Sequence, residues 1–467
     1  MKRRWEFIAL LALLTAVCAA LAAACGSSSS SSSASSADDD ASPSDDDVSP
    51  ADDDDDSSPA APVTPHREDR GKYAVVWLAG TPYEMGHQHG VMLHDELAAG
   101  IDWLNSMDLV QILVPIARAL GLLQMAEDNT YTDIVQECQG LVDAAGDVGW
   151  TMDVCLLLNF GDVLIEFLTD GIPPATDVPL EPACTQAVAT GAATKDGRLY
   201  HMRSLDWGNI PYLLDYPVIF VRQPSDGIPH VYIGFPGNLS PYNGINAAGL
   251  SIASNQAEPH DQSQHSRTGR SNVQMLGQLL KLAHNIDEAQ QMIETTPHMA
   301  CINIVVADGN AREAAAFEIT SKQLGIRELT DDTVWETNHF VASNMQNADK
   351  QPRDPSSLLR YDRVSQLVPR DGKDSIFGKI DPAAFVGVLR DRVNPYNDTV
   401  SPPVFDNGGM SIATNAAIYQ IVFDPEALNF WVAAGGVPVP SQPFEGFSLS
   451  ELLDWPNSTP VVPGVIQ

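Results

Sequence analysis

Basic residues are scarce in this sequence. It contains 26 lysines and arginines against 61 aspartates and glutamates, so its formal net charge at pH 7 is −35 over 467 residues. Such an excess of negative charge is repelled by phosphate groups. Nucleic acids and anionic membrane surfaces are therefore poor partners for the body of the protein, and we expect no nucleic acid to bind.

Long apolar runs are also lacking, except at the N-terminus. Residues 1–24 combine a basic start at 2–4, an apolar stretch at 7–20 and small residues at 22–24, which is the pattern of a secretory signal peptide. No other stretch has the length and hydrophobicity needed to span a bilayer. A covalently attached lipid would then be the only membrane anchor.

Cys25 directly follows these small residues, an arrangement that resembles the bacterial lipobox. The resemblance implies a diacylated Cys25 at the mature N-terminus, in the bacterial cell envelope and facing outside the cytoplasm. Ordinary cleavage near Ala24, which would leave a secreted protein, is the alternative. Residues 25–70 are rich in serine and aspartate and poor in apolar side chains, so we expect them to form a disordered tether.

Cysteine and histidine are too few and too scattered to indicate a metal site. The only closely spaced histidines are His87 and His89, and residues two apart on a helix face different sides. We expect no metal and no cofactor. Three of the six cysteines, Cys138, Cys155 and Cys301, can form at most one disulfide. Cys138 and Cys155 lie in apolar, helix-like segments, where packing as thiols is the other possibility.

The segment at residues 183–207 carries a chemical signal. Cys184 opens an alternating, β-prone run, a polar turn at 195–197 reverses the chain, and a second short strand carries Arg203 and Asp206. The end of the second strand of such a hairpin returns to the level of the start of the first. We therefore expect Cys184, Arg203 and Asp206 to lie close together, an arrangement that favours the thiolate.

The order Cys-Thr, Asp-Gly turn and Arg-x-x-Asp-Trp resembles the N-terminal-nucleophile (Ntn) cysteine hydrolases. The branch it resembles is the penicillin acyltransferase-like group, which is related to acid ceramidase and the choloylglycine hydrolases. The resemblance implies that the precursor cuts its own backbone between Ala183 and Cys184. The freed α-amine, with a reference pKa of about 8, would accept the proton of a thiol whose reference pKa is about 8.5. Arg203 would favour the thiolate, and Asp206 would hold the amine.

Further motifs extend the resemblance over residues 73–440. Thr-Asn-His-Phe at 337–340 matches the family position at which an asparagine, here Asn338, donates to the tetrahedral oxyanion. Asn255 ends a strand that follows an Asn-x-x-Gly-Leu turn, one residue short of the family spacing, and is a second oxyanion candidate. An arginine that supports the site in the family corresponds to Arg360 or Arg363.

The opening motif at residues 78–90 belongs to the same resemblance. Thr81, followed by Pro82 and Glu84, is a helix-start signal. We expect the glycines that follow, Gly86 and Gly90, to permit close packing of this helix against a neighbour.

Hydrophobic periodicity divides the folded body into two parts. Residues 109–170 show the 3–4 spacing of helices, whereas the chain after Cys184 shows period-two strands interrupted by one long predicted helix at 271–296. This pattern fits two antiparallel sheets between helical layers, and the resemblance implies an α+β fold of the αββα Ntn-hydrolase type. After cleavage, residues 71–183 would form a helical α subunit and residues 184–467 the catalytic β subunit, held together non-covalently.

The expected function is amide hydrolysis or acyl transfer at a non-peptide C–N bond, through an acyl-enzyme on Cys184 and with a small-molecule amide or N-acyl substrate. A Ser-His-Asp hydrolase is a weaker candidate because the sequence contains no Gly-x-Ser-x-Gly. The alternative from another class is a catalytically silent Ntn-like lipoprotein that serves as a surface binding domain. A denaturing gel separates the two hypotheses, because an active precursor should yield two fragments.

Overall fold

The computed structural model describes residues 63–106, 108–161, 163, 167, 183–208, 210–402, 410–454 and 460–467. The described residues all belong to one compact unit, which extends to residue 467. The predicted signal peptide, the lipidation candidate Cys25 and most of the predicted tether lie outside the described residues. Within the described ranges, no helix is both long enough and apolar enough to cross a membrane.

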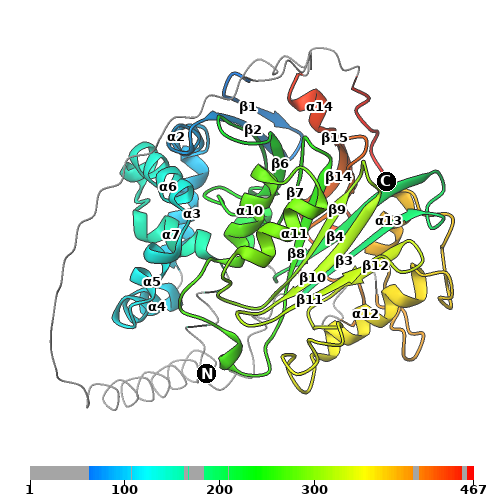
Figure 1. Ribbon diagram of the computed structural model, residues 1–467. Coiled ribbons are helices and arrows are strands. Elements are labelled where there is room, and N and C mark those ends of the chain that lie inside the picture. Colours follow the sequence, from blue (N-terminus) through cyan, green and yellow to red (C-terminus); the bar gives the residue numbers. More distant parts are fainter. Residues whose placement is uncertain are drawn as a thin grey trace, which may run out of the picture. The chain divides into compact units, whose positions relative to one another are not determined.

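The described residues form two β-sheets (Figure 1). The larger sheet has nine strands in the order β1 (His66–Arg70), β2 (Tyr73–Gly80), β5 (Val218–Pro224), β6 (His230–Gly234), β7 (Asn243–Asn246), β8 (Leu250–Gln256), β9 (Ile302–Asp308), β10 (Glu313–Ile319) and β11 (Leu324–Glu328). The smaller has six, in the order β12 (Thr333–Glu336), β3 (Ala183–Gly191), β4 (Gly197–Asp206), β13 (Ala417–Asp424), β14 (Asn429–Ala434) and β15 (Glu445–Ser448). Neighbouring strands within these described sheets are antiparallel, except that β2 runs parallel to β5.

Helices cover the outer face of each sheet (Figure 1). Those on the nine-stranded sheet are α2 (Pro82–Met92), α3 (His94–Ser106), α6 (Thr132–Ala145), α7 (Met152–Phe160), α10 (Asn272–Leu282) and α11 (Ile286–Thr295). Those on the six-stranded sheet are α12 (Pro355–Leu367) and α13 (Pro382–Leu389). The other described α-helices are α4 (Asp108–Ala119), α5 (Leu122–Asn129), α9 (Pro211–Asp215) and α14 (Leu449–Leu452). The αββα layering implied by the sequence resemblance is confirmed.

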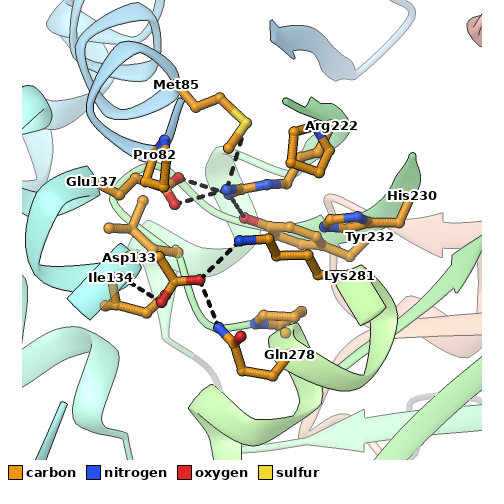
Figure 2. Close-up of a pocket in the computed structure, with 14 residues that line it drawn as sticks. Pro82, Met85, Asp133, Ile134, Glu137, Arg222, His230, Tyr232, Gln278 and Lys281 are labelled. Atoms are coloured by element: carbon orange, nitrogen blue, oxygen red, sulfur yellow. Dashed lines mark hydrogen bonds and ion pairs between the residues drawn. The ribbon is translucent and has the colours of Figure 1, made fainter. Parts of the chain in front are cut away.

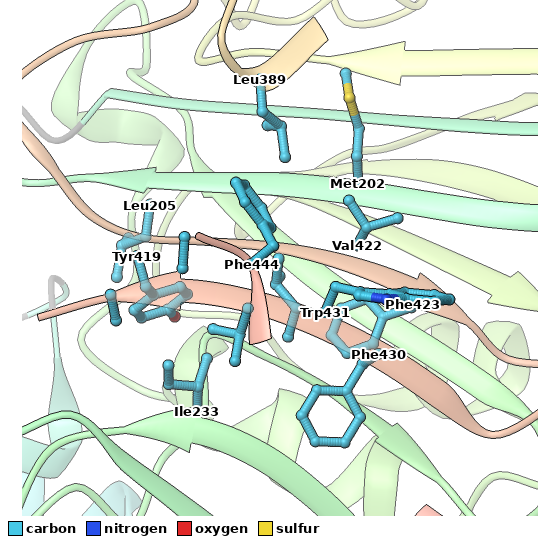
Figure 3. Packing of buried hydrophobic residues seen from close by; sticks show 14 of the residues in the cluster. Met202, Leu205, Ile233, Leu389, Tyr419, Val422, Phe423, Phe430, Trp431 and Phe444 are labelled. Carbon is cyan, nitrogen blue, oxygen red and sulfur yellow. The ribbon is translucent and has the colours of Figure 1, made fainter. Parts of the chain in front are cut away.

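Apolar side chains from both sheets meet in one buried cluster (Figure 3). Ile219 and Ile233 of the nine-stranded sheet share it with Tyr419, Ile421 and Phe423 of the six-stranded sheet. Removing such side chains from water is the main force that holds two sheets face to face. The packing also brings the start of β3 close to β8 and β13, which carry the polar groups described below.

The predicted start of α2 is confirmed. Thr81 Oγ1 accepts a hydrogen bond from Glu84 N at 3.3 Å, and the Glu84 carboxylate accepts one from Thr81 N at 2.7 Å. The expected role of the α2 glycines is confirmed as well. A Cβ at Gly86 would lie 1.9 Å from the carbonyl oxygen of Glu137 on α6, and one at Gly90 would lie 2.6 Å from a side chain of α6. These glycines let the two helices approach each other closely.

The prediction of one long helix at 271–296 is wrong. The chain forms α10 and α11 instead, separated at residues 283–285. Asn285 accepts a hydrogen bond from Glu288 N at 2.9 Å, so its side chain caps α11. Leu282, which the uninterrupted helix would have directed inward, is 42% exposed.

The folded body begins earlier than predicted. Residues 66–70, which we assigned to the tether, pair with β2 as strand β1. The alternatives for Cys138 and Cys155 are also decided, because these residues form a disulfide that joins α6 to α7.

Candidate active site

Cys184 and Arg203 lie on the same face of the six-stranded sheet, at the open end of the β3–β4 hairpin. The strand register pairs Cys184 with Leu205 and Gln186 with Arg203. Since side chains alternate along a strand, all four point toward the nine-stranded sheet. Arg203 Nη2 lies 3.7 Å from Cys184 Sγ. The structure therefore places a thiol and a guanidinium in contact, as the hairpin predicted.

The Arg203 guanidinium is fully buried and held from three directions. Its Nε and Nη2 donate to the carbonyl oxygen of Ser254 on β8 at 3.1 and 2.8 Å, and its Nη1 donates to the hydroxyl of Tyr419 on β13 at 3.2 Å. The guanidinium carbon also lies 5.6 Å from the centre of the Tyr419 ring. The Tyr419 hydroxyl in turn accepts a hydrogen bond from Asn243 Nδ2 at 2.6 Å.

Tyr419 and Asn243 were missed by the sequence analysis. Asn243 opens the segment that carries the Asn-x-x-Gly-Leu turn, but the motif itself points to Asn255, and its strand β7 meets the site only through the packing of the two sheets. Tyr419 lies on β13, which joins the sheet of Cys184 from more than 200 residues further along the chain. Tyr419 pairs in register with Leu205, which itself pairs with Cys184. A prediction of the β4–β13 register would have been needed to find it.

Asn338 and Arg360 meet the backbone of Cys184. Asn338 Oδ1 accepts hydrogen bonds from Cys184 N at 2.8 Å and from Arg360 Nη2 at 2.9 Å. Arg360 Nη1 donates to Cys184 O and, at 3.0 Å, to Thr185 Oγ1. The side chain of Arg363 points elsewhere, to Asp374 and Asp391. Of the two candidate arginines, the structure therefore places Arg360 at the site.

Asp206 lies opposite Ala183 in the β3–β4 register, next to the predicted cleavage point. Its Oδ1 accepts a hydrogen bond from Ser204 Oγ at 2.6 Å, whereas its buried Oδ2 accepts none from any described residue. Burial raises the pKa of Asp206 to about 6, against the opposing charges of Arg360 and Arg203.

Asn255 does not line the pocket around Cys184. Its Nδ2 donates to the carbonyl oxygens of Glu336 and Thr337, both at 3.1 Å, and it thereby holds the segment that leads to Asn338. Strand alternation turns its neighbours, Ser254 and Gln256, toward Cys184. The one-residue departure of Asn255 from the family spacing is the sequence signal that points to Gln256.

A small pocket opens beside the Cys184 sulfur. Its lining residues are Cys184, Arg203, Leu205, Trp207, Tyr242, Ser254, Gln256 and Ile302. The rings of Trp207 and Tyr242 meet edge to face, with centroids 5.7 Å apart. Apart from the sulfur and one strip of polar groups, the walls are apolar. The sulfur of Cys184 therefore lies beside a small, mainly apolar pocket.

In the uncut chain the Cys184 thiol is buried. Burial raises its pKa, and the positive charge of Arg203 lowers it. The carboxylate of Asp206 raises it further, whereas the charge of Arg360 and a hydrogen bond from the Asp206 backbone lower it, so that the pKa stays above its ordinary value. The desolvated thiol thus depends on these neighbours to become a nucleophile. Within the described residues, no group of three histidine, cysteine or acidic side chains is placed to hold a metal ion.

Ser357, on the first turn of α12, was also missed from the sequence. Its Oγ accepts a hydrogen bond from Asn338 N at 2.8 Å and lies 2.8 Å from His339 Nδ1 and 3.0 Å from Thr337 Oγ1. Burial lowers the pKa of His339 to about 3, so the imidazole is neutral at physiological pH. Ser357 and His339 therefore fix the Thr-Asn-His segment and keep Asn338 in place.

The two sheets between helical layers are the fold of the Ntn-type amide-bond enzymes, and the cysteine, arginines and asparagine meet within this fold. Residues 193–436, just over half of the chain, match the sequence model of the family "acyl-coenzyme A:6-aminopenicillanic acid acyl-transferase". The chain belongs to this family. The resemblance read from the sequence motifs is therefore confirmed.

Three similar proteins illustrate the relationship. An uncharacterized protein of Archaeoglobus fulgidus is 25% identical over 401 residues, which cover 78% of this chain and 64% of the relative. Protein dcd1B of Dictyostelium discoideum is 22% identical over 296 residues, 57% of this chain and 54% of the relative. The alignments thus span less than two thirds of either relative. The structure of the Caenorhabditis elegans ortholog of N-acylethanolamine-hydrolyzing acid amidase superposes with a TM-score of 0.37 at 17% identity, over 52% of this chain and 93% of that one.

Proposed function

We propose that this protein is a self-cleaving cysteine amidohydrolase or acyltransferase that acts on a non-peptide amide bond through an acyl-enzyme on Cys184. One observation carries the proposal: the sulfur and the backbone nitrogen of Cys184 are both held at the same site. The sulfur lies 3.7 Å from Arg203 Nη2, and the nitrogen donates to Asn338 Oδ1 at 2.8 Å. A nucleophile whose own amine serves as its base needs both atoms positioned in this way.

The first reaction is the cut between Ala183 and Cys184. The Cys184 sulfur adds to the carbonyl carbon of Ala183, the C–N bond breaks as the nitrogen takes a proton, and water hydrolyses the resulting thioester. The products are a carboxylate on Ala183 and a free α-amine on Cys184. Asp206 lies opposite Ala183 with one carboxylate oxygen that accepts no hydrogen bond from the described residues. This oxygen is suited to hold the new amine.

After the cut, the same residues would act on the amide substrate. The α-amine takes the thiol proton, and Arg203 stabilises the thiolate, which attacks the substrate carbonyl. Asn338 Nδ2 uses one of its two hydrogens on the carbonyl oxygen of Gln256 at 2.8 Å, so the second is available for the oxyanion, with the Gln256 side chain as the other proposed donor. The proton on the amine passes to the leaving nitrogen. Water, or an acceptor amine, then releases the acyl group from Cys184.

The pocket suggests the chemistry of the acyl group. Leu205, Trp207, Tyr242 and Ile302 supply its apolar walls. The cation among the lining residues, Arg203, is already engaged by Ser254, Tyr419 and the sulfur. An anionic acyl group would therefore lack a partner in this pocket, which favours N-acyl substrates with an uncharged, apolar acyl part.

Denaturing gel electrophoresis with mass spectrometry of the purified full chain tests the proposal. We expect two fragments and a new N-terminus at Cys184, and we expect Cys184→Ser to lose both efficient cutting and amide hydrolysis. Cys301→Ser is the matched control, because Cys301 is equally buried and lies outside the site; it should still be cut. If Cys184→Ser is cut and hydrolyses amides at the wild-type rate, the mechanism is wrong. A single uncut band without amidase activity would favour the silent binding lipoprotein.

We also propose that the protein is located outside the cytoplasm, anchored to the membrane by a lipid. The signal-peptide pattern and the small residues before Cys25 support a lipid anchor that faces outside the cytoplasm. Only the fragment that ends at residue 183 would then carry the lipid, and the catalytic fragment would stay at the membrane through non-covalent contacts. The mature N-terminal mass distinguishes a diacylated Cys25 from an unmodified, secreted form.

A further inference from the structure

A buried ion pair lies on the helix-covered face of the nine-stranded sheet, in a pocket whose lining does not include Cys184 (Figure 2). Arg222 of β5 donates from Nη1 to Glu137 Oε1 and from Nη2 to Glu137 Oε2, both at 2.7 Å. The two side chains are only 7% and 2% exposed. Arg222 Nη1 also donates to the Tyr232 hydroxyl at 3.3 Å, and Met85 Sδ lies 3.8 Å from Nη2. The pair is thus enclosed by protein on both sides.

A second charged pair lies beside the first, in the same pocket. Lys281 Nζ is 3.4 Å from the carboxylate of Asp133 and 3.0 Å from that of the more exposed Asp226, which also follows residue 184. Gln278 Nε2 donates to the Asp133 carboxylate at 2.8 Å. Figure 2 shows both carboxylates on one wall and their partners on the facing one. We call the four side chains of these two pairs the seam cluster. Its acids, Asp133 and Glu137, both lie on α6. Its bases, Arg222 and Lys281, lie on β5 and α10.

These two sides fall on different parts of the chain. Helix α6 precedes residue 183, whereas β5 and α10 follow residue 184. The parallel pairing of β2 with β5 crosses the same boundary and sets Leu78 beside Arg222. A cut between residues 183 and 184 therefore turns the seam cluster into a contact between two chains, with the acids on the first fragment and the bases on the second.

We propose that the Glu137–Arg222 pair keeps the two fragments docked in register after cleavage; this inference rests on the proposed self-cleavage. Around the pair, the facing surfaces are apolar, with Val76, Met85 and Phe220 in the same buried cluster. A misplaced fragment would bury a carboxylate or a guanidinium without a partner, which costs far more than the pair itself contributes. The native docking satisfies both charges at once.

The test compares fragment release from the cleaved, full-length protein by size-exclusion chromatography in increasing urea. Arg222→Met should raise the dissociation constant of the fragments by about 100-fold or more, because it leaves Glu137 buried without a partner. The double variant Glu137→Met with Arg222→Met should bind its fragments more tightly than either single variant, since no charge is then left unpaired.

Two controls separate docking from general stability. Arg363 is equally buried, with a side chain 5% exposed, but its ion-pair partners Asp374 and Asp391 lie in the same fragment as itself. Arg363→Met should destabilise the second fragment without preferentially releasing the first. In a Cys184→Ala background, which keeps the chain uncut, Arg222→Met should elute as one species.

The outcomes are distinguishable. Wild-type protein that runs as one band on a denaturing gel lacks self-cleavage, and the inference fails together with the proposed function. If the wild type gives two bands but Arg222→Met does not change the release of the fragments, the inference alone is overturned. It is also overturned if Arg363→Met releases the first fragment as readily as Arg222→Met does. If Arg222→Met does not fold, the double variant Glu137→Met with Arg222→Met still tests the inference. Its fragments should stay associated because no charge is left unpaired, so an affinity about 100-fold weaker than that of the wild type would overturn the inference.

Discussion

The substitution Tyr419→Phe tests whether the hydroxyl of Tyr419 holds the Arg203 guanidinium next to the Cys184 sulfur. The substitution removes one oxygen and keeps the ring, so the contact between the ring and the guanidinium persists. The lost hydroxyl accepts hydrogen bonds from Arg203 Nη1 at 3.2 Å and Asn243 Nδ2 at 2.6 Å. Both donors are buried and would lose this acceptor, at a cost of about 1–3 kcal/mol for each. We expect the guanidinium to shift away from the sulfur as a result.

The effect on the thiol follows from the distance. At an effective dielectric constant of about 20, two unit charges about 4 Å apart interact by about 4 kcal/mol, and a further 1 Å of separation removes roughly 1 kcal/mol. Because the charge of Arg203 lowers the pKa of Cys184, moving it away raises that pKa. At a fixed pH below that pKa, the thiolate population should fall by about fivefold.

The assay is the rate of alkylation of Cys184 by iodoacetamide as a function of pH, followed by mass spectrometry of the peptide that contains it. Tyr73→Phe is the matched control. Tyr73 is as buried as Tyr419, and its hydroxyl donates to the carbonyl oxygen of Val432 at 2.9 Å, with no contact to the site. It should lower stability and leave the alkylation profile unchanged. An unchanged profile in Tyr419→Phe would refute the claim that the tyrosine positions the guanidinium.

Three further predictions concern the pH response, the oxyanion residue and the helix packing. In the uncut chain the pKa of Asp206 is raised to about 6, so the native state binds this proton more tightly than the unfolded state. Its contribution to the free energy of unfolding should therefore grow as pH falls through 6. Urea unfolding at pH 7 and pH 5 in a Cys184→Ala background, which keeps the chain uncut, should show this contribution, and the further substitution Asp206→Asn should abolish it. Ser357→Ala removes the acceptor of the Asn338 N–H and should lower kcat about tenfold with little change in KM, whereas Ser357→Thr should retain most of the activity. Gly86→Ala should lower the unfolding midpoint by several degrees in a thermal melt, because its Cβ would lie 1.9 Å from Glu137 O; an unchanged midpoint would contradict the close α2–α6 contact.

The sequence predicted the contact between Cys184 and Arg203 because a hairpin is a local structure. A turn and two alternating strands determine which residues face each other and on which side of the sheet they lie. The start of α2 was predictable for the same reason, since its capping residues are neighbours in the chain. The break between α10 and α11 was missed because apolar spacing continues across Asn285, while the capping hydrogen bond depends on the backbone turning there.

Residues that reach the site from distant strands were harder to find. Tyr419 reaches Arg203 through the register of β13 against β4, and Asn243 reaches Tyr419 through the packing of one sheet on the other. Asn255 and Gln256 are adjacent, so an error of one position in register exchanges a pocket-lining side chain for one on the opposite face. A match to a sequence motif permits a shift of one residue, whereas in a sheet the same shift turns the side chain to the opposite face.

The sequence by itself determined the candidate site of this protein: a cysteine that starts a strand, an arginine and an aspartate on the return strand, and an asparagine motif further on, all within short stretches whose geometry is local. Tertiary structure alone decided that Arg360 and not Arg363 reaches Cys184, that Gln256 and not Asn255 lines the pocket, and that Glu137 meets Arg222. Each of these choices depends on which face of an element is buried against another, and that is determined by the packing of the whole core.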